Sequence, residues 1–116
     1  MIIQGHKDEI EGIHVPESHA LNTVKKVIFN PDNGWSSHVM RIFTMHENGG
    51  THKHQHDWPH YVYVLNGSGK IEIDQDEYFV EEGNYMLIPS DVPHSIQNQG
   101  KKPFEFMCIV PPEGEK

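Results

Sequence analysis

The sequence predicts an all-β domain, either an antiparallel sandwich or a barrel, and two observations lead to this fold class. Turn-forming dipeptides such as Asn33-Gly34 and Asn66-Gly67 recur at short intervals along the chain, and turn signals about every 8–12 residues are typical of antiparallel folds. Between the turns lie short runs rich in β-branched and aromatic residues, none long enough for an ordinary helix. Parallel βαβ units would need helical stretches of about a dozen residues between strands. An antiparallel fold is therefore favoured.

Seven of these runs are the predicted strands. They cover residues 39–45, 61–65, 70–73, 78–80, 85–88, 95–97 and 104–110. In the third run, Ile71 and Ile73 share one face and acidic residues the other, which is typical of a strand with one buried side. In the last run, Phe104, Phe106 and Cys108 share a face. These alternations place one apolar face of the predicted sheet inside.

Two other segments are less regular. Residues 61–65 are apolar throughout, which predicts that both faces of this strand are covered. Residues 20–29 fit either a strand or a helical turn. We assign all 116 residues to one domain, 1–116, because independent domains typically contain about 100–150 residues.

Composition excludes several classes of protein. Nine Lys and Arg against 17 Asp and Glu give a net charge of −8, which repels nucleic acids and anionic membrane surfaces. Cys108 is the single cysteine, so an intrachain disulfide and every paired-cysteine zinc site are excluded. The first nine residues lack a basic segment followed by a long apolar run, and we therefore expect a soluble, cytoplasmic protein.

The chain has ten histidines, and four of them form a candidate metal site. His54 and His56 are two residues apart, so an extended backbone would place both imidazoles on one face. Pro59 would bend the chain and could fold His60 toward them. His94 lies at the start of another predicted strand. The alternative is that these are solvated surface residues.

Four neutral imidazoles suit a divalent transition ion, because nitrogen donors fit manganese, iron, cobalt, nickel, copper or zinc better than magnesium or calcium. A six-coordinate ion held by four histidines would keep two positions open. We expect one such ion per chain, held by His54, His56, His60 and His94.

These residues resemble the two motifs of the cupin family. The first motif, at about residues 49–67, is matched by Gly49, His54, His56 and Gly67, with His60 at the position of the motif's glutamate. The second motif, at about residues 83–98, is matched by its glycine, proline, histidine and asparagine. These are Gly83, Pro89, His94 and Asn98. The resemblance implies the cupin double-stranded β-helix, a jelly-roll barrel.

Two positions depart from these motifs. Asp91 replaces a glycine, a substitution that a turn tolerates because Asp visits left-handed conformations more readily than most residues. His60 replaces a glutamate, so four neutral ligands would leave the ion its full double positive charge and make it a stronger Lewis acid.

The His-x-His-x-Trp-x-His pattern of residues 54–60 is most similar to the small four-histidine manganese cupins. That resemblance implies a homodimer, oxidative chemistry on small unsaturated or aromatic compounds, and a preference for manganese or iron. The affinity of imidazole ligands for divalent ions would also allow nickel, cobalt, zinc or copper to bind.

Four residues are candidates for a substrate pocket. Arg41 lies in an otherwise apolar strand, so it either reaches solvent or projects into the barrel to bind a carboxylate or oxyanion. Trp58 either lines the pocket or packs beside a turn. Phe106 and Cys108 face the metal by resemblance, and core packing is the alternative. No general base or catalytic side chain is identified by the sequence.

Other histidines are expected outside the site. We place His52 at the pocket rim or in solvent and the remaining five on the surface. These five are His6, His14, His19, His38 and His46.

Three functions follow from these observations. The leading hypothesis is a transition-metal-dependent oxygenase-type enzyme acting on a small organic substrate. An isomerase or lyase acting on a small carbonyl or carboxylate compound is the enzymatic alternative. A non-catalytic module that binds a small ligand or metal is the third, because one fold hosts many functions.

Overall fold

A computed structural model describes residues 1–115 of the chain. Within these residues nine strands form, β1 (Ile13–His14), β2 (Ala20–Phe29), β3 (Val39–Thr51), β4 (His60–Asn66), β5 (Ser68–Ile73), β6 (Asp76–Glu81), β7 (Tyr85–Ile88), β8 (His94–Asn98) and β9 (Phe104–Val110). Three short 3-10 helices are η1 (Lys7–Glu9), η2 (Pro31–Asn33) and η3 (Pro112–Glu115). None of the helices in residues 1–115 has the length and apolarity that crossing a membrane requires.

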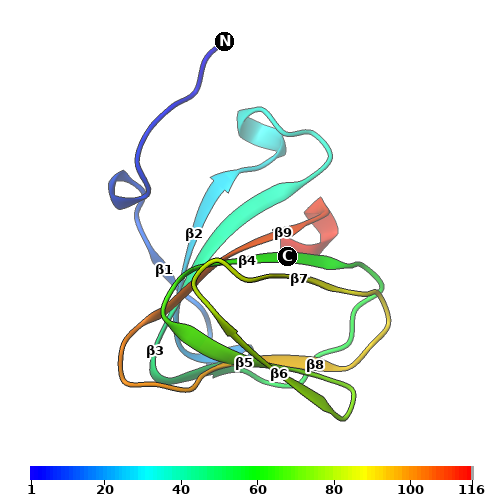
Figure 1. Ribbon diagram of the computed structural model, residues 1–116. Coiled ribbons are helices and arrows are strands. Elements are labelled where there is room, and N and C mark those ends of the chain that lie inside the picture. The colour runs from blue at the N-terminus through cyan, green and yellow to red at the C-terminus, as the bar shows by residue number, and fades with distance from the viewer. Residues whose placement is uncertain (116) are drawn as a thin grey trace.

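The strands curl into a barrel (Figure 1). Their order in the sheet is β6-β5-β8-β3-β9-β4-β7, β2 pairs with β3, β1 pairs with β2, and the pairings are antiparallel. The predicted all-β class is confirmed, and each of the seven predicted strands overlaps one of β3 to β9. Strand β3 is the longest, and its pairing with β2, β8 and β9 joins the two halves of the barrel.

Residues 20–29 form a strand, which settles the ambiguity between strand and helical turn. Strand β2 pairs with β3 over most of its length, from Ala20 opposite Thr51 to Phe29 opposite Met40. Its β-branched residues favour an extended backbone. The register shifts between Leu21 and Thr23 and again between Val27 and Phe29, and such irregularities bend a strand.

The prediction that both faces of residues 61–65 are covered is wrong. Val62 and Val64 are buried, but Tyr61 and Tyr63 are 47% and 46% exposed. Strand β4 therefore buries one face, and no described residue covers the other. The prediction counted tyrosine as an apolar residue. Its hydroxyl can remain in water while the ring lies on the sheet, so a tyrosine does not require a covered face.

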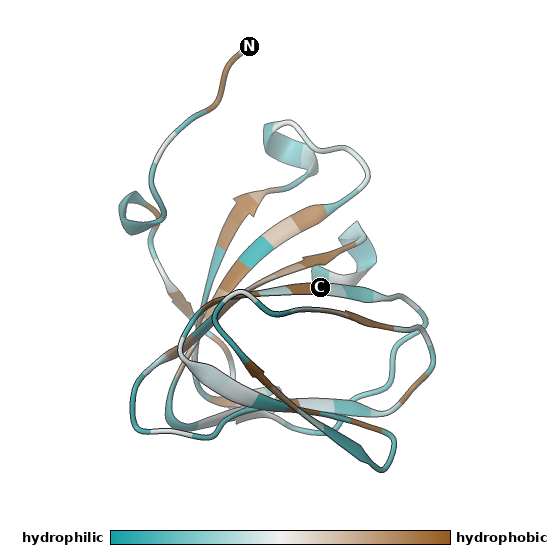
Figure 2. Cartoon of the chain, viewed as in Figure 1, coloured by the Kyte–Doolittle hydropathy of each residue, from teal (hydrophilic) through white to brown (hydrophobic). Residues whose placement is uncertain are grey.

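The inner face of the barrel forms one hydrophobic core. Its buried residues are Val39, Met45, Val62, Val64, Ile71, Val80, Ile88, Ile96, Phe104, Phe106, Cys108 and Val110. In Figure 2 the tip of the β5–β6 hairpin is hydrophilic, as expected for a solvated turn. Asp91 has φ +62°, so this residue takes the left-handed conformation expected where the motif has glycine.

We predict that Gly69→Ala destabilises the barrel by about 1–3 kcal/mol, the usual cost of overpacking a core. A Cβ at Gly69 would lie 2.3 Å from the ring of fully buried Phe104, and that ring has no room to move. Chemical denaturation measures the effect. Gly5→Ala is the matched control, because a Cβ there meets nothing within 4 Å. Equal denaturation midpoints for the two variants would contradict the close packing of Gly69 against Phe104.

Candidate metal centre

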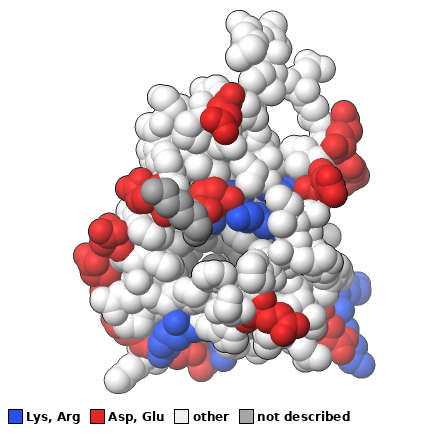
Figure 3. All heavy atoms as spheres, turned by 180° about the vertical axis from the view of Figure 1, so that it is seen from behind, with Lys and Arg blue, Asp and Glu red and all other residues white. Residues whose placement is uncertain are grey.

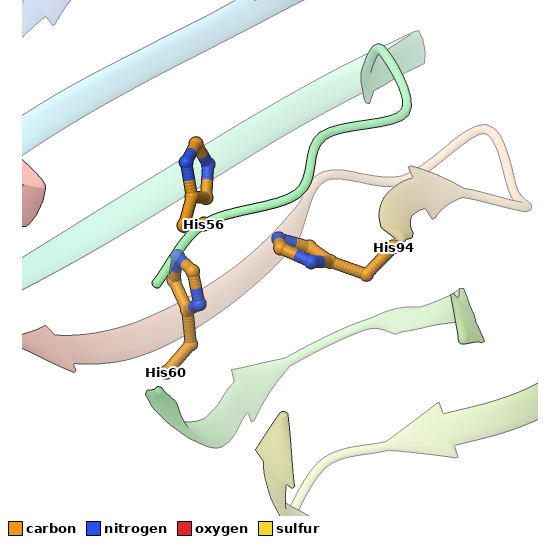
Figure 4. A group of neighbouring side chains, drawn as sticks. All are labelled: His56, His60 and His94. Atoms are coloured by element: carbon orange, nitrogen blue, oxygen red, sulfur yellow. The ribbon is translucent and has the colours of Figure 1, made fainter. Parts of the chain in front are cut away.

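Three histidines from separate parts of the barrel converge on one point. His56 lies in the segment between β3 and β4, His60 begins β4, and His94 begins β8. One ring nitrogen from each lies within 4.8 Å of the others. Figure 4 shows the three rings close to one another, each carried by a different segment of the chain.

Backbone hydrogen bonds hold the segment that carries His56 in place. Strand β3 ends at Thr51, and residues 52–59 then cross to β4. His54 and His94 exchange both backbone hydrogen bonds, each 2.8 Å long, and the Asp91 N–H donates to the carbonyl of His56. The segment is thereby fixed to β8 and to the turn before it, which brings His56 beside His94.

One hydrogen bond determines the tautomer of His94, and one nitrogen of His60 lacks a partner within residues 1–115. The Nδ1–H of His94 donates to the carbonyl of Val92 at 3.1 Å, so the lone pair of this imidazole is on Nε2. Nδ1 of His60 is buried and has no hydrogen-bond partner among the described residues. An unsatisfied buried nitrogen is costly, and a bound cation would satisfy it.

The electrostatics keep these imidazoles uncharged. Burial lowers the pKa of His60 to about 3, and electrostatic interaction with the neighbouring His94 ring and with the Arg41 cation acts in the same direction. Burial also lowers the pKa values of His56 and His94. Neutral imidazoles offer lone pairs at neutral pH. The three residues therefore fit a divalent transition ion, for which nitrogen donors are suited.

The fourth predicted ligand, His54, lies beside this group and is not part of it. Its ring centroid is 5.5 Å from that of His56, but its Nε2 lies 3.3 Å from the carbonyl of His19, whose ring stacks on it. The expectation of one common face required an extended backbone, whereas strand β3 ends at Thr51. A four-histidine ligand set stays a prediction.

The three histidines line a cavity of about 380 Å³ inside the barrel. Its walls are largely apolar, formed by residues such as Phe43, Met45, Ile96 and Phe106. Phe106 is also part of the core, as the packing alternative expects, and a position facing a metal stays a prediction. A mostly apolar cavity with a few polar groups is typical of small-molecule sites.

Trp58 lies in the cavity wall and also packs against His56. Its ring stacks on that of His56 with centroids 4.6 Å apart and an interplanar angle of 7°. The indole limits the orientations open to His56. Nε1 of Trp58 is buried without a hydrogen-bond partner among residues 1–115.

Arg41 projects into the barrel, the second of the two orientations considered from the sequence. It is 7% exposed and lines the cavity. Its Nη2–H donates to Sγ of Cys108 at 3.1 Å, and its guanidinium lies 4.9 Å from the ring centroid of Phe43. Burial raises the pKa of the Cys108 thiol, so this cysteine stays protonated and is not an activated nucleophile.

Sequence reasoning missed two charged residues of the cavity, Lys25 and Glu115. Lys25 lies in β2, whose conformation the sequence left open, and Glu115 lies in η3, which follows the last predicted strand. No motif marks either residue. His14 and His19, expected on the surface, are exposed and also lie at the edge of the cavity.

The remaining histidines lie outside the group of three. His52 is exposed, and its Nε2 donates to the carbonyl of Glu17 at 2.7 Å. His6 and His46 are exposed, and His38 is half-buried.

The low pKa of His60 predicts a specific pH dependence of stability in the metal-free protein. Between pH 6.5, the ordinary pKa, and pH 3 the unfolded chain binds a proton that folded His60 does not, so stability falls as the pH drops through this range. Thermal melts from pH 7 to pH 4 measure it. His60→Asn should flatten the profile, whereas His46→Asn, on the surface, should not. If the pH profiles of melting temperature for wild type and His60→Asn superimpose, His60 is not the source of the pH dependence.

Comparison with known proteins gives the family and three relatives. Residues 41–110 match the model of the Cupin domain family, Cupin_2. An uncharacterised protein of Methanocaldococcus jannaschii is 34% identical over 53% of this chain and 48% of its own length, so the chain aligns with about half of that relative. The oxalate-binding protein of Thermotoga maritima is 24% identical over 93% of this chain and 80% of its own.

A solved structure resembles the whole barrel. The polyketide cyclase RemF of Streptomyces resistomycificus superposes with a TM-score of 0.89 at 25% identity, covering 97% of this chain and 80% of that one. The topology of the barrel, the histidines at the motif positions and the family match over residues 41–110 agree. The chain belongs to the cupin family.

Proposed function

We propose that this chain is an enzyme that holds one divalent transition ion and acts on a small organic substrate in the adjoining cavity, with oxygenase-type chemistry as the leading assignment. The observation that carries the proposal is the convergence of His56, His60 and His94, with ligand nitrogens within 4.8 Å of one another. Their uncharged state and the unsatisfied Nδ1 of His60 support it.

The similarity of residues 54–60 to the four-histidine manganese cupins favours manganese or iron. When bound, the ion would supply a Lewis acid and, if it is manganese or iron, a redox partner for dioxygen chemistry. His54 is the proposed fourth ligand, supported by the proximity of its ring to that of His56.

The chain's own side chains orient the ligands and the substrate. The carbonyl of Val92 fixes the ring of His94, and Trp58 stacks on His56. The apolar walls beside the histidines would limit the hydration of a bound substrate. Arg41 lies in this space with its charge desolvated and is suited to hold an anionic group of the substrate.

The two alternatives also have support. The relative named a polyketide cyclase favours chemistry on a small carbonyl compound without oxygen, an isomerase or lyase in which the ion polarises a carbonyl. The relative named an oxalate-binding protein favours a module that binds a small carboxylate without turnover.

Addition of manganese, iron, cobalt or nickel to the metal-free protein should raise its melting temperature, and magnesium or calcium should not. At a free metal concentration of about 100 times Kd the gain in stability is roughly 2.7 kcal/mol. Differential scanning fluorimetry checks this, and an absence of response to every transition ion would end the proposal.

Substitution of the ligands separates the three observed histidines from the proposed fourth. His56→Ala and His94→Ala should each abolish stoichiometric metal binding, because each variant leaves only two of the three imidazoles. His54→Ala should weaken binding without abolishing it. Elemental analysis of protein purified without nickel resin measures the metal. His46→Ala is the surface control, and loss of metal in that variant would show that the effect is not local.

Oxygen uptake discriminates between the proposed reactions. An oxygenase should consume dioxygen with members of a panel of phenolic and alkene substrates and be inactive under anaerobic conditions. An isomerase or lyase should act equally well without oxygen, and a binding module should turn over none of the panel.

The homodimer that the resemblance implies stays a prediction. Four exposed side chains, Tyr61, Tyr63, Tyr85 and Leu87, lie next to one another on paired strands β4 and β7 and form the kind of apolar surface that a partner would cover. Light scattering of the purified chain measures its mass in solution.

A further inference from the structure

A carboxylate of the chain itself lies against two basic side chains in the cavity. Oε1 of Glu115 is 3.3 Å from Nη1 of Arg41, and Oε2 is 2.6 Å from Nζ of Lys25. The two basic residues come from neighbouring strands, β3 and β2, and Glu115 comes from η3. All three side chains line the same cavity as the histidines.

The basic pair has the properties of an anion-binding site. The side chain of Arg41 is 8% exposed, and its Nε has no hydrogen-bond partner among the described residues. Its other contacts, the Cys108 thiol and the face of Phe43, carry no formal charge. Glu115 is its one carboxylate partner in residues 1–115. A buried guanidinium is costly without an anion, and its planar donors suit a carboxylate.

The segment that supplies Glu115 lies outside the sheet that carries the basic pair. Helix η3 has four residues, Pro112–Glu115, and the Gly114 N–H donates to the Pro111 carbonyl just before it. Short 3-10 turns have weak hydrogen-bond geometry. The Glu115 side chain is 23% exposed, against 8% for Arg41. The carboxylate is thus more accessible to solvent than the guanidinium it pairs with, and its short turn lies outside the strands that carry both cations.

A negatively charged substrate needs local attraction here. The chain has a net charge of −8, so the protein as a whole repels anions. Figure 3 shows basic groups gathered beside a hollow on one face, with acidic groups around them. Two cations inside the cavity would overcome the general repulsion at that one place.

We propose that Arg41 and Lys25 form the subsite for the carboxylate of the substrate, and that Glu115 occupies this subsite as an internal competitor which the substrate displaces. The inference rests on the proposed function, because the body of the substrate would extend from this pair toward the histidines. The apolar walls at Phe43, Met45 and Phe106 favour a small organic acid with an apolar body.

Isothermal titration of the full-length chain with benzoate tests the proposal, and uncharged benzamide is the ligand control. Glu115→Gln removes the competing charge and should tighten benzoate binding on the order of tenfold, the change expected if the free subsite is open about one-tenth of the time. Glu113→Gln is the matched variant, because it makes the same change in the same turn at an exposed position. Equal benzoate affinity in wild type, Glu115→Gln and Glu113→Gln would overturn the proposal.

Removal of the cations should have the opposite effect. Lys25→Gln and Arg41→Gln should each weaken benzoate binding about tenfold or more, and Glu115→Gln should no longer tighten binding when combined with Arg41→Gln. Lys26→Gln is the control on the same strand, since Lys26 bonds instead to the carbonyl of Lys7. If Arg41→Gln does not fold, Lys25→Gln decides the question, and undiminished benzoate affinity in that variant overturns the proposal.

Elemental analysis of each titrated sample separates this inference from the proposed function. Metal-loaded protein in which Glu115→Gln changes nothing would refute the subsite alone. Protein that binds no metal but gains benzoate affinity with Glu115→Gln would support the subsite and refute the metal-dependent enzyme.

Discussion

The pair of backbone hydrogen bonds between His54 and His94 is the contact on which the site depends. Each is 2.8 Å long, and together they form an isolated bridge outside the main strands. Together with the bond from the Asp91 N–H to the His56 carbonyl, this bridge tethers residues 52–59 and places His56 beside His94. The side chain of His94 contributes a ring nitrogen to the group of three, while its backbone holds the segment that carries His56.

Burial then determines the chemistry of the ligands. Burial in the barrel removes His60 from water. The loss of hydration destabilises the charged imidazolium more than the neutral ring, so the pKa of His60 falls. Arg41 lowers the pKa of His60 further, because its positive charge in the same cavity repels a proton on His60. Its own charge is balanced by Glu115. The cavity thus keeps neutral nitrogen donors at one place and a paired cation at another.

Much of this could be predicted from the sequence, because strand alternation and turn residues act locally. The inward face of Phe104, Phe106 and Cys108 follows from their spacing, and all three are buried. Asp91 in a left-handed conformation follows from its place in a motif turn. The exposed faces of Tyr61 and Tyr63 were not predicted, because sequence spacing does not show whether another element covers a strand.

The orientation of the cavity residues depended on tertiary contacts that no local pattern records. The Nε2 of His54 lies 3.3 Å from the carbonyl of His19, a residue 35 positions away in the sequence. The ion pairs of Glu115 with Arg41 and Lys25 join residues 74 and 90 positions apart. Spacing within a motif cannot reveal such pairs.

The position of Trp58 makes its fluorescence a reporter of the cavity. One side of its indole stacks on His56, and its Nε1 lies so close to Gly114 that an added Cβ would come within 2.8 Å. A single chromophore therefore touches both the histidine group and the turn that carries Glu115. Its emission would shift with the occupancy of either region, and comparison with Trp35 replaced by Phe would isolate that signal from the second indole of the chain.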